Sequence, residues 1–302
     1  MSRLKHLFMS FITIHPVNKV LRVLVRPVAD KLPFSFPITG TIDYRLPNGK
    51  VVKFVNDGRD SHATRLYWDN ETGFEPETIS VYLELLRHAR VVFDVGANVG
   101  IYSLIAAVND PQCSVHGFEP VPFIYAYYAR NVQANKLQNL QPNQAAVTTK
   151  SGEITLYIPD SVQLPSDAST VEGYREGVVP TQVKAVSLDE YAAEHKLARV
   201  DLMKVDAEGA EHQVFAGAQT IMERDKPAII CEILHGFVDE NVKQFFADHN
   251  YRYFLVTDDG LVEHQEIIGD KSFRYKNYLF IPEERIPTML ANIPVQRMAE
   301  FV

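Results

Sequence analysis

From residue 91 onward, hydrophobic positions alternate between two kinds of pattern. Short uninterrupted apolar runs, typical of buried strands, are separated by segments whose apolar residues recur at helical spacing. The predicted strands cover residues 91–95, 114–118, 140–147, 200–205, 228–234, 251–256 and 275–281. The predicted helices cover residues 100–108, 122–135, 210–223 and 239–248. Strands that alternate with helices form parallel sheets covered on both faces, so the pattern predicts a doubly wound α/β core over residues 91–282.

A smaller element is predicted before the core, over residues 32–90. Residues 36–55 alternate β-formers around Pro47-Asn48-Gly49, and an Asn-Gly pair between two such runs indicates a tight hairpin. Residues 77–89 then show an apolar face at helical spacing. We therefore expect a β-hairpin and a helix that lead into the first core strand. Residues 283–302, after the core, are expected to form a C-terminal tail.

The alternation of strands and helices breaks between about residues 148 and 188. Two strand-like stretches, 153–158 and 182–185, flank a polar segment at 160–178. A loop of this length inside a compact domain is usually functional or disordered. We interpret it as a lid inserted in the core, over a ligand crevice.

Residues 1–31 differ from the rest of the chain in charge and pattern. They hold six basic residues and one acid, whereas the whole chain has a formal net charge of -8. Apolar residues recur at helical spacing on both sides of Pro16, which predicts two short amphipathic helices. No apolar run approaches the ~20 residues of a membrane span. Two interpretations stay open: peripheral contact with an anionic membrane or partner, and packing on the chain's own domain.

Composition narrows the class of protein. The negative net charge and a pI near 5.7 argue against a nucleic-acid partner, which would require a basic face. The two cysteines, Cys113 and Cys231, each lie in an apolar stretch, so we expect neither a disulfide nor a thiolate metal site. A reducing, cytoplasmic location follows as an expectation. No pattern indicates an oligomeric state.

The first core strand ends in a carboxylate and a glycine-bearing turn, Asp94 to Gly100. Such a turn lets backbone amides approach a ligand, and the helix that follows favours a bound anion. Glu119 ends the second strand, 23 residues after Gly96, where a carboxylate can accept hydrogen bonds from ribose hydroxyls. The turn lacks the G-x-G-x-x-G spacing that holds a pyrophosphate. This favours a nucleoside ligand without phosphates over a nicotinamide dinucleotide.

Four blocks of this sequence resemble the FkbM-type methyltransferases. They are FDVGANVGIYS (Phe93 to Ser103), GFEP (Gly117 to Pro120), KVDAEGAE (Lys204 to Glu211) and NYLFIP (Asn277 to Pro282). The resemblance covers roughly residues 75–282. It implies a Rossmann-like methyltransferase that uses S-adenosyl-L-methionine, commonly on a hydroxyl of a sugar, polyketide or similar natural product. By position it also implies that Asp94, Gly96 and Asn98 line the methionine end of the donor and that Glu119 takes the ribose.

Acidic residues also follow the later strands, on the side where an acceptor is expected. Asp206 and Glu208 follow the fourth strand and Glu232 ends the fifth, so their carboxylates are expected to converge. Such a group persists if one member keeps a proton and acts as a general base, or if a divalent cation such as Mg²⁺ neutralises it. Asp206 is also a candidate donor-binding residue. For Glu211 we favour an exposed acid in a first helical turn. His235, just beyond Glu232, is either a further acceptor-side residue or a loop histidine without a role, and the sequence leaves both open.

The leading hypothesis is an S-adenosylmethionine-dependent O-methyltransferase with a small-molecule or glycan acceptor. A nicotinamide-dependent oxidoreductase is the first alternative, and the missing phosphate-binding spacing disfavours it. The second is a non-catalytic binding module with a methyltransferase-like fold. Three acids, Asp94, Glu119 and Asp206, argue against this second alternative. Burying carboxylates around one crevice costs free energy, and a protein that only binds a partner gains nothing from keeping them there.

Overall fold

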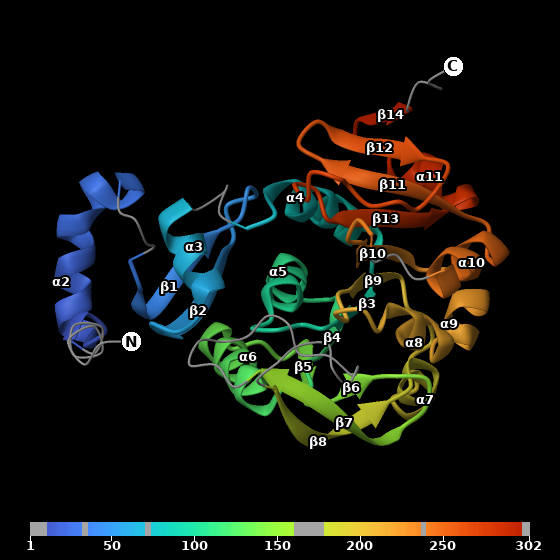
Figure 1. The fold of residues 1–302 in the computed structure, drawn as a ribbon. Coiled ribbons are helices and arrows are strands. Elements are labelled where there is room, and N and C mark those ends of the chain that lie inside the picture. Colours follow the sequence, from blue (N-terminus) through green and yellow to red (C-terminus); the bar gives the residue numbers. More distant parts are fainter. Residues whose placement is uncertain (1–10, 32–35, 70–73, 160–177, 237–239, 298–302) are drawn as a thin grey trace.

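The main element of the fold is a mixed β-sheet (Figure 1). The computed structural model describes residues 11–31, 36–69, 74–159, 178–236 and 240–297. Within these residues nine strands form the main sheet. Their order is β14 (Val295–Arg297), β12 (Gly260–His264), β11 (Tyr251–Thr257), β13 (Asn277–Pro282), β10 (Ala228–Glu232), β9 (Leu202–Val205), β3 (Val91–Val95), β4 (Ser114–Phe118) and β5 (Leu140–Asn143).

The five strands from β10 to β5 are parallel, as the sequence pattern predicts. The chain enters at β3, adds β4 and β5 on one side, and later adds β9 and β10 on the other. The order therefore reverses between β3 and β9, and doubly wound sheets bind ligands at such a switch point. The rest of the sheet is not parallel throughout, because β13 pairs antiparallel with both β10 and β11. No crossover helix separates β11, β12 and β13, and only crossovers permit parallel pairing of consecutive strands.

Two apolar cores cover the two faces of the sheet. Val92 and Ile230 point to the first core, and Phe93 and Ile229 point to the second, as expected for successive residues of a strand. The first core is covered by α4 (Pro76–Leu85), α5 (Ile101–Asn109) and α6 (Pro122–Asn135). The second is covered by α7 (Leu188–Glu194), α8 (Glu211–Ala216), α9 (Gln219–Arg224) and α10 (Glu240–Asp248). This layered arrangement confirms the predicted Rossmann-like α/β fold.

Two predicted core elements are each divided in the structure. The strand predicted at 140–147 splits into β5 and β6 (Ala146–Val147), and β6 joins a three-stranded sheet with β7 (Gly152–Pro159) and β8 (Val178–Val186). The helix predicted at 210–223 is interrupted at Gly217, whose carbonyl accepts hydrogen bonds from the Asp189 amide and the Ser187 hydroxyl. That carbonyl is turned toward α7, so the helical hydrogen bonds end there. The polar loop predicted at 160–178 lies, except for Val178, outside the described residues.

The leader contains the predicted hairpin, β1 (Thr39–Arg45) and β2 (Val51–Asp57), with Gly49 in the turn at φ 83°. The outer edge of β2 is covered by α6, because the amides of Val55 and Lys53 donate to the side chains of Asn131 and Asn135. A further helix, α3 (Ser61–Asp69), follows; its short, weakly apolar sequence did not predict it. The leader is thereby attached to the core through α6.

Short elements complete the two ends of the chain. At the N-terminus, α2 (His15–Val25) and the 3-10 turn η1 (Arg26–Lys31) confirm the second predicted helix, whereas most of the first lies outside the described residues. After α4 comes η3 (Leu86–His88), and after β13 come η4 (Glu283–Arg285) and α11 (Ile286–Met289). The expected tail also contributes β14 to the sheet, where it pairs with β12.

Candidate functional site

A cavity of about 800 Å³ opens at the carboxyl ends of β3, β4, β9 and β10, at the switch point of the sheet. All seven site residues predicted from the sequence line it: Asp94, Gly96, Asn98, Glu119, Asp206, Glu208 and Glu232. Three of its walls come from other parts of the chain. They are α3 with residues 74–77 at the start of α4, the residues before β13, and Leu156 of β7. The cavity is therefore assembled by the leader, the core and the inserted sheet together.

The turn after β3 is held by internal hydrogen bonds. The amides of Gly96 and Ala97 both donate to the carbonyl of Phe118. Gly96 has φ 74°, and a Cβ there would lie 1.8 Å from the carbonyl oxygen of Asp206. Glycine at position 96 is therefore required by the close approach of the chain after β9. The sequence suggested that the turn presents its backbone amides to a ligand. The amide of Gly96 is instead used by the carbonyl of Phe118.

Asp94 is buried and caps the helix that follows the turn. Its Oδ2 accepts hydrogen bonds from the amide and the hydroxyl of Ser103, at 2.8 and 2.6 Å. Burial raises the pKa of Asp94 to about 6, although the bonds from Ser103 oppose the rise. The amide of Ser103, which a bound anion could have used, is occupied by this carboxylate.

Glu119 joins the turns after β3 and β4. Its Oε2 accepts from the amide of Asn98 at 2.9 Å, and its Oε1 accepts from the amide of Val121 at 2.8 Å. The side chain is 4% exposed, and burial raises the pKa of Glu119 to about 7. Asn98 adopts a left-handed conformation with φ 51°, which directs its amide to Glu119. Each carboxylate oxygen keeps a lone pair that a ligand hydroxyl can use.

Asp206 and Glu232 lie side by side at the ends of β9 and β10. The parallel register sets Cys231 opposite Val205, so the two acids that follow these residues are neighbours. Each faces a lysine: Lys204 Nζ lies 3.6 Å from Asp206 Oδ2, and Lys276 Nζ lies 3.7 Å from Glu232 Oε1.

The two acids are partly buried, and each has a lysine within ion-pair distance. Burial, and next the charge of Asp206, raise the pKa of Glu232 to about 8. Among the described residues, Asp206 Oδ1 is buried and has no hydrogen-bond partner. The described residues contain no group of three or more His, Cys, Asp or Glu side chains placed to hold a metal ion.

The remaining acceptor-side candidates have separate environments. Glu208 lies in the turn after β9 with φ 50° and lines the cavity. Glu211 is half-buried, and its Oε1 accepts from the amides of Ala207 and Gly209. The expectation of an exposed acid was therefore wrong for Glu211, because its side chain folds back over the turn. His235 binds the carbonyl of Ile268 and is not among the residues that line the cavity.

Three cavity residues were not singled out from the sequence. Glu75 Oε2 accepts hydrogen bonds from Tyr102 Oη at 2.5 Å and from Asn277 Nδ2 at 2.9 Å. Among the described residues, Asn277 Oδ1 is buried and has no hydrogen-bond partner. Asn277 begins the NYLFIP block and Tyr102, in α5, lies in the FDVGANVGIYS block. Membership in these blocks was the sequence signal that could have identified the two residues as part of the site. Glu75 precedes α4 in the leader and belongs to no motif.

Comparisons with known proteins agree on the family. A model described as the methyltransferase FkbM domain matches residues 94–253, more than half of the chain. The 31-O-demethyl-FK506 methyltransferase FkbM of Streptomyces tacrolimicus is 31% identical over 205 residues, which cover 58% of this chain and 75% of that protein. The hexuronic acid methyltransferase AglP of Haloferax volcanii is 23% identical over 174 residues, which cover 58% of this chain and 68% of that protein.

Among solved structures, the methyltransferase FkbM from Methylobacillus flagellatus KT is 15% identical. It superposes with a TM-score of 0.42, over 74% of this chain and 55% of that chain. From the match of the family model and the 31% identity to a relative covered over three quarters of its length, this chain belongs to the FkbM family of S-adenosylmethionine-dependent methyltransferases.

Proposed function

We propose that this enzyme methylates a hydroxyl oxygen of a small-molecule or glycan acceptor. The observation that carries the proposal is the pairing of Asp206 with Glu232 in the cavity, beside the turns that would hold the donor. A hydroxyl must lose its proton as it attacks, and a carboxyl group with a raised pKa is suited to accept that proton. Glu232 has that property.

The residues around the turns fit the donor. S-adenosylmethionine, when bound, supplies a methyl group that its sulfonium already activates. We assign the ribose to Glu119, whose oxygens keep free lone pairs, and the methionine end to Asp94, Gly96 and Asn98. The unpartnered Oδ1 of Asp206 suits a ligand that brings a hydrogen-bond donor or a positive charge.

The acceptor side then performs two tasks. Glu232 takes the hydroxyl proton onto a carboxylate oxygen, and Asp206 keeps that carboxylate basic through its neighbouring charge. Lys204 and Lys276 hold the two acids in place at 3.6 and 3.7 Å. The remaining rate enhancement is expected to come from alignment of the hydroxyl, which can supply several kcal/mol.

A divalent cation is the alternative way to activate the hydroxyl. The two lysines favour the base route, because each acid already faces a positive charge. Treatment with a chelator separates the two routes: methyl transfer survives it in the base route and is lost in the cation route.

The acceptor class is proposed from two considerations. The relatives named above are, by their names, a 31-O-demethyl-FK506 methyltransferase and a hexuronic acid methyltransferase. The lining of the cavity includes the polar side chains of His62, Arg65 and Arg274. A hydroxylated acceptor, neutral or carrying a carboxylate, suits both. We further propose that residues 148–188 act as a lid, since Leu156 of β7 lines the same cavity.

Calorimetry tests the donor assignment. The wild type should bind S-adenosylmethionine and not a nicotinamide dinucleotide. Glu119→Ala should weaken donor binding ~30-fold or more, because two charge-assisted hydrogen bonds are worth ~2 to 3 kcal/mol. Glu211→Ala is the matched control, since Glu211 also binds two backbone amides of a turn but is not assigned to the donor. Equal affinity in the Glu119 variant and the wild type would refute the assignment.

A further inference from the structure

Helix α2 presents apolar side chains on two sides. Leu21 and Val25 pack against the first core. Val20, Val23 and Leu24 are 61, 67 and 68% exposed, although a surface helix normally places polar residues on its outer side. The three lie at spacings of three and four residues, so they form one stripe along the helix. We call Val20, Val23 and Leu24 the outer stripe.

The helix is fixed to the leader, so the outer stripe is a defined surface. The Asn18 side chain is fully buried and donates to the carbonyls of Ile12 and Pro37. The same side chain accepts from the amide of Thr39, the first residue of β1. Arg22 lies over the ring of Tyr67 in α3, 5.2 Å from its centroid. These contacts orient α2 so that the outer stripe faces away from the protein.

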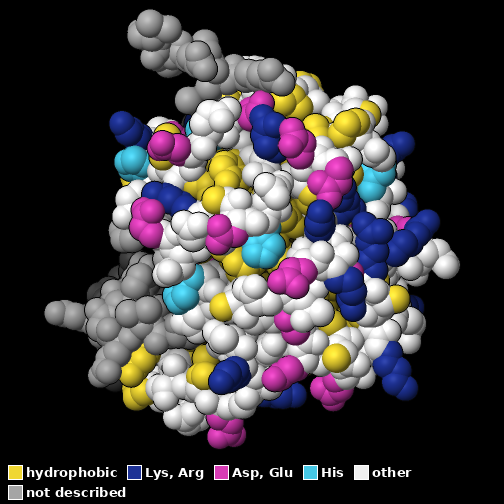
Figure 2. Space-filling model, turned by 90° about the vertical axis from the view of Figure 1, so that its right-hand side faces the viewer, with side chains coloured by type: hydrophobic (Ala, Val, Ile, Leu, Met, Phe, Trp, Pro, Cys, Tyr) yellow, Lys and Arg dark blue, Asp and Glu magenta, His cyan; other side chains and the backbone are white. Residues whose placement is uncertain are grey.

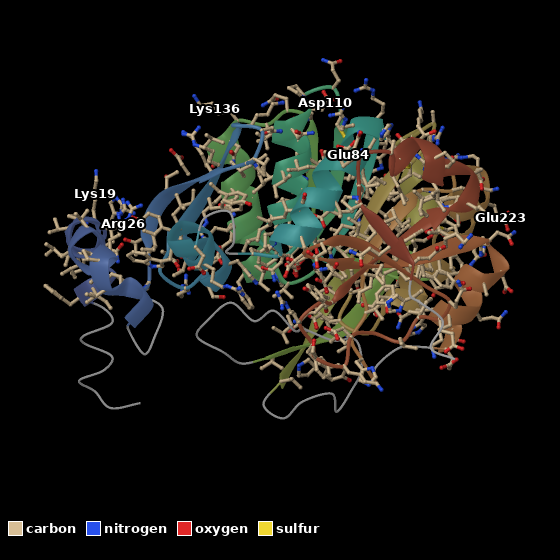
Figure 3. The ribbon with its side chains drawn as sticks, turned by 90° about the horizontal axis from the view of Figure 1, so that it is seen from above. Lys19, Arg26, Glu84, Asp110, Lys136 and Glu223 are labelled. Atoms are coloured by element: carbon tan, nitrogen blue, oxygen red, sulfur yellow. The ribbon has the colours of Figure 1, made fainter. Side chains whose placement is uncertain are left out.

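Cationic side chains accompany the outer stripe. Lys19 precedes Val20, and Arg26 follows the helix; both are exposed. Figure 3 shows both beside α2, with Lys19 pointing away from the molecule at its edge. Residues 1–31 carry six basic residues and one acid, whereas the rest of the chain carries a formal charge of about -13. Along the sequence, positive charge is therefore concentrated in the segment that contains α2, and in the described part of that segment Lys19 and Arg26 are the exposed cations that flank the outer stripe.

The opposite side of the protein lacks this combination. Figure 2 shows that side, where apolar side chains are scattered among acidic and basic ones. An apolar stripe with basic neighbours is the composition of helices that lie in the plane of a membrane surface. In the described part of the chain, no helix is long and apolar enough to cross a membrane.

We propose that α2 docks the enzyme on the surface of an anionic lipid bilayer. The outer stripe enters the boundary between headgroups and acyl chains, and Lys19 and Arg26 contact anionic headgroups. The acidic body is repelled by the same surface, which favours an orientation with α2 toward the membrane. Because α3 contacts α2 through Tyr67 and lines the candidate cavity through His62 and Arg65, docking would hold this wall of the cavity toward the bilayer.

Vesicle co-sedimentation of the full chain tests this surface. The probes are vesicles of phosphatidylcholine with about a third phosphatidylserine, and vesicles of phosphatidylcholine alone. We expect the wild type to sediment with the anionic vesicles, and less with neutral ones or in high salt. Val20→Glu with Leu24→Glu should weaken vesicle binding ~10-fold or more, because both apolar burial and charge attraction are lost. Lys19→Gln with Arg26→Gln should weaken it and reduce its dependence on salt.

Matched controls distinguish this surface from a general change in charge. Val295→Glu changes an exposed apolar residue on β14, at the far end of the main sheet (Figure 1). Lys136→Gln with Lys271→Gln removes two exposed charges elsewhere. These controls should bind vesicles like the wild type, and all variants should bind S-adenosylmethionine with wild-type affinity.

Two results would overturn the proposal. The first is vesicle binding that is unchanged in the Val20→Glu and Leu24→Glu double variant. The second is a wild-type dimer, seen by sedimentation equilibrium without vesicles, that this double variant converts to a monomer, because the stripe would then belong to an interface between two copies. Failure of methyl transfer would bear on the proposed function and not on this surface, since vesicle binding is measured without an acceptor.

Discussion

Replacing Glu232 with glutamine should separate the stability of the protein from its activity. Burial raises the pKa of Glu232 to about 8 from an ordinary value of 4.5. Below pH 4.5 the group is protonated in both the folded and the unfolded chain, so it does not affect the free energy of unfolding. Between the two pKa values only the unfolded chain is charged, and stability falls as the pH rises. Above pH 8 the group is charged in both states, and the free energy of unfolding is lower by the full amount that the pKa difference gives.

The size of the effect follows from the pKa difference. A rise of this size corresponds to ~5 kcal/mol of unfolding free energy at high pH. Removing the carboxylate recovers that free energy, but the glutamine amide in Glu232→Gln would be buried without hydrogen-bond partners, which costs ~1 to 3 kcal/mol of unfolding free energy. Lys276, which would lose its ionic partner, is half exposed and contributes little. The variant should therefore be more stable than the wild type at pH 8.5, and the difference between them should change by ~4 kcal/mol from pH 5 to pH 8.5.

Urea unfolding of the donor-free protein at the two pH values measures this change. Glu223→Gln is the control, because Glu223 is an exposed acid on α9 (Figure 3), and we expect no pH-dependent difference from it. Methyl transfer to a panel of hydroxylated acceptors should fall ~10²-fold or more in Glu232→Gln. A stability difference that does not depend on pH would show that Glu232 ionises freely in the folded protein. A stabilised variant with full activity would show that it is not the base.

Three further predictions concern the neighbouring residues. Gly96→Ala should lower the free energy of unfolding by ~3 kcal/mol or more, because the new Cβ would meet the Asp206 carbonyl. Gly49→Ala is the control: Gly49 has a similar φ but open space around it, so the same urea titration should show a loss of only ~1 kcal/mol. Asp206→Asn should reduce turnover ~10²-fold, far more than it weakens donor binding in calorimetry; near-wild-type turnover would make Asp206 structural. Chelator should leave turnover unchanged, and a loss restored by Mg²⁺ would establish the cation route.

Local sequence was sufficient for the elements that carry the donor side. The strands β3 and β4, the turn from Asp94 to Gly100 and the acid at Glu119 are each readable within a short window, because periodicity and turn chemistry are local properties. The reason for Gly96 was not readable in this way. It depends on the carbonyl of Asp206, which lies far along the chain and is brought there by the pairing of β3 with β9.

The acceptor side was decided mainly by tertiary structure. The sequence placed acids at Asp206 and Glu232 and predicted that they converge, and the register of β9 and β10 confirms that they are neighbours. Their burial and their lysine partners depend on the tertiary structure. Glu75 has no local signal, since its carboxylate acquires its role through hydrogen bonds from Tyr102 and Asn277, which come from different elements. The charge and helical spacing of residues 1–31 likewise predicted two amphipathic helices, of which the structure describes the second, α2. Which apolar side faces solvent was set by Asn18, whose hydrogen bonds fix α2 to β1.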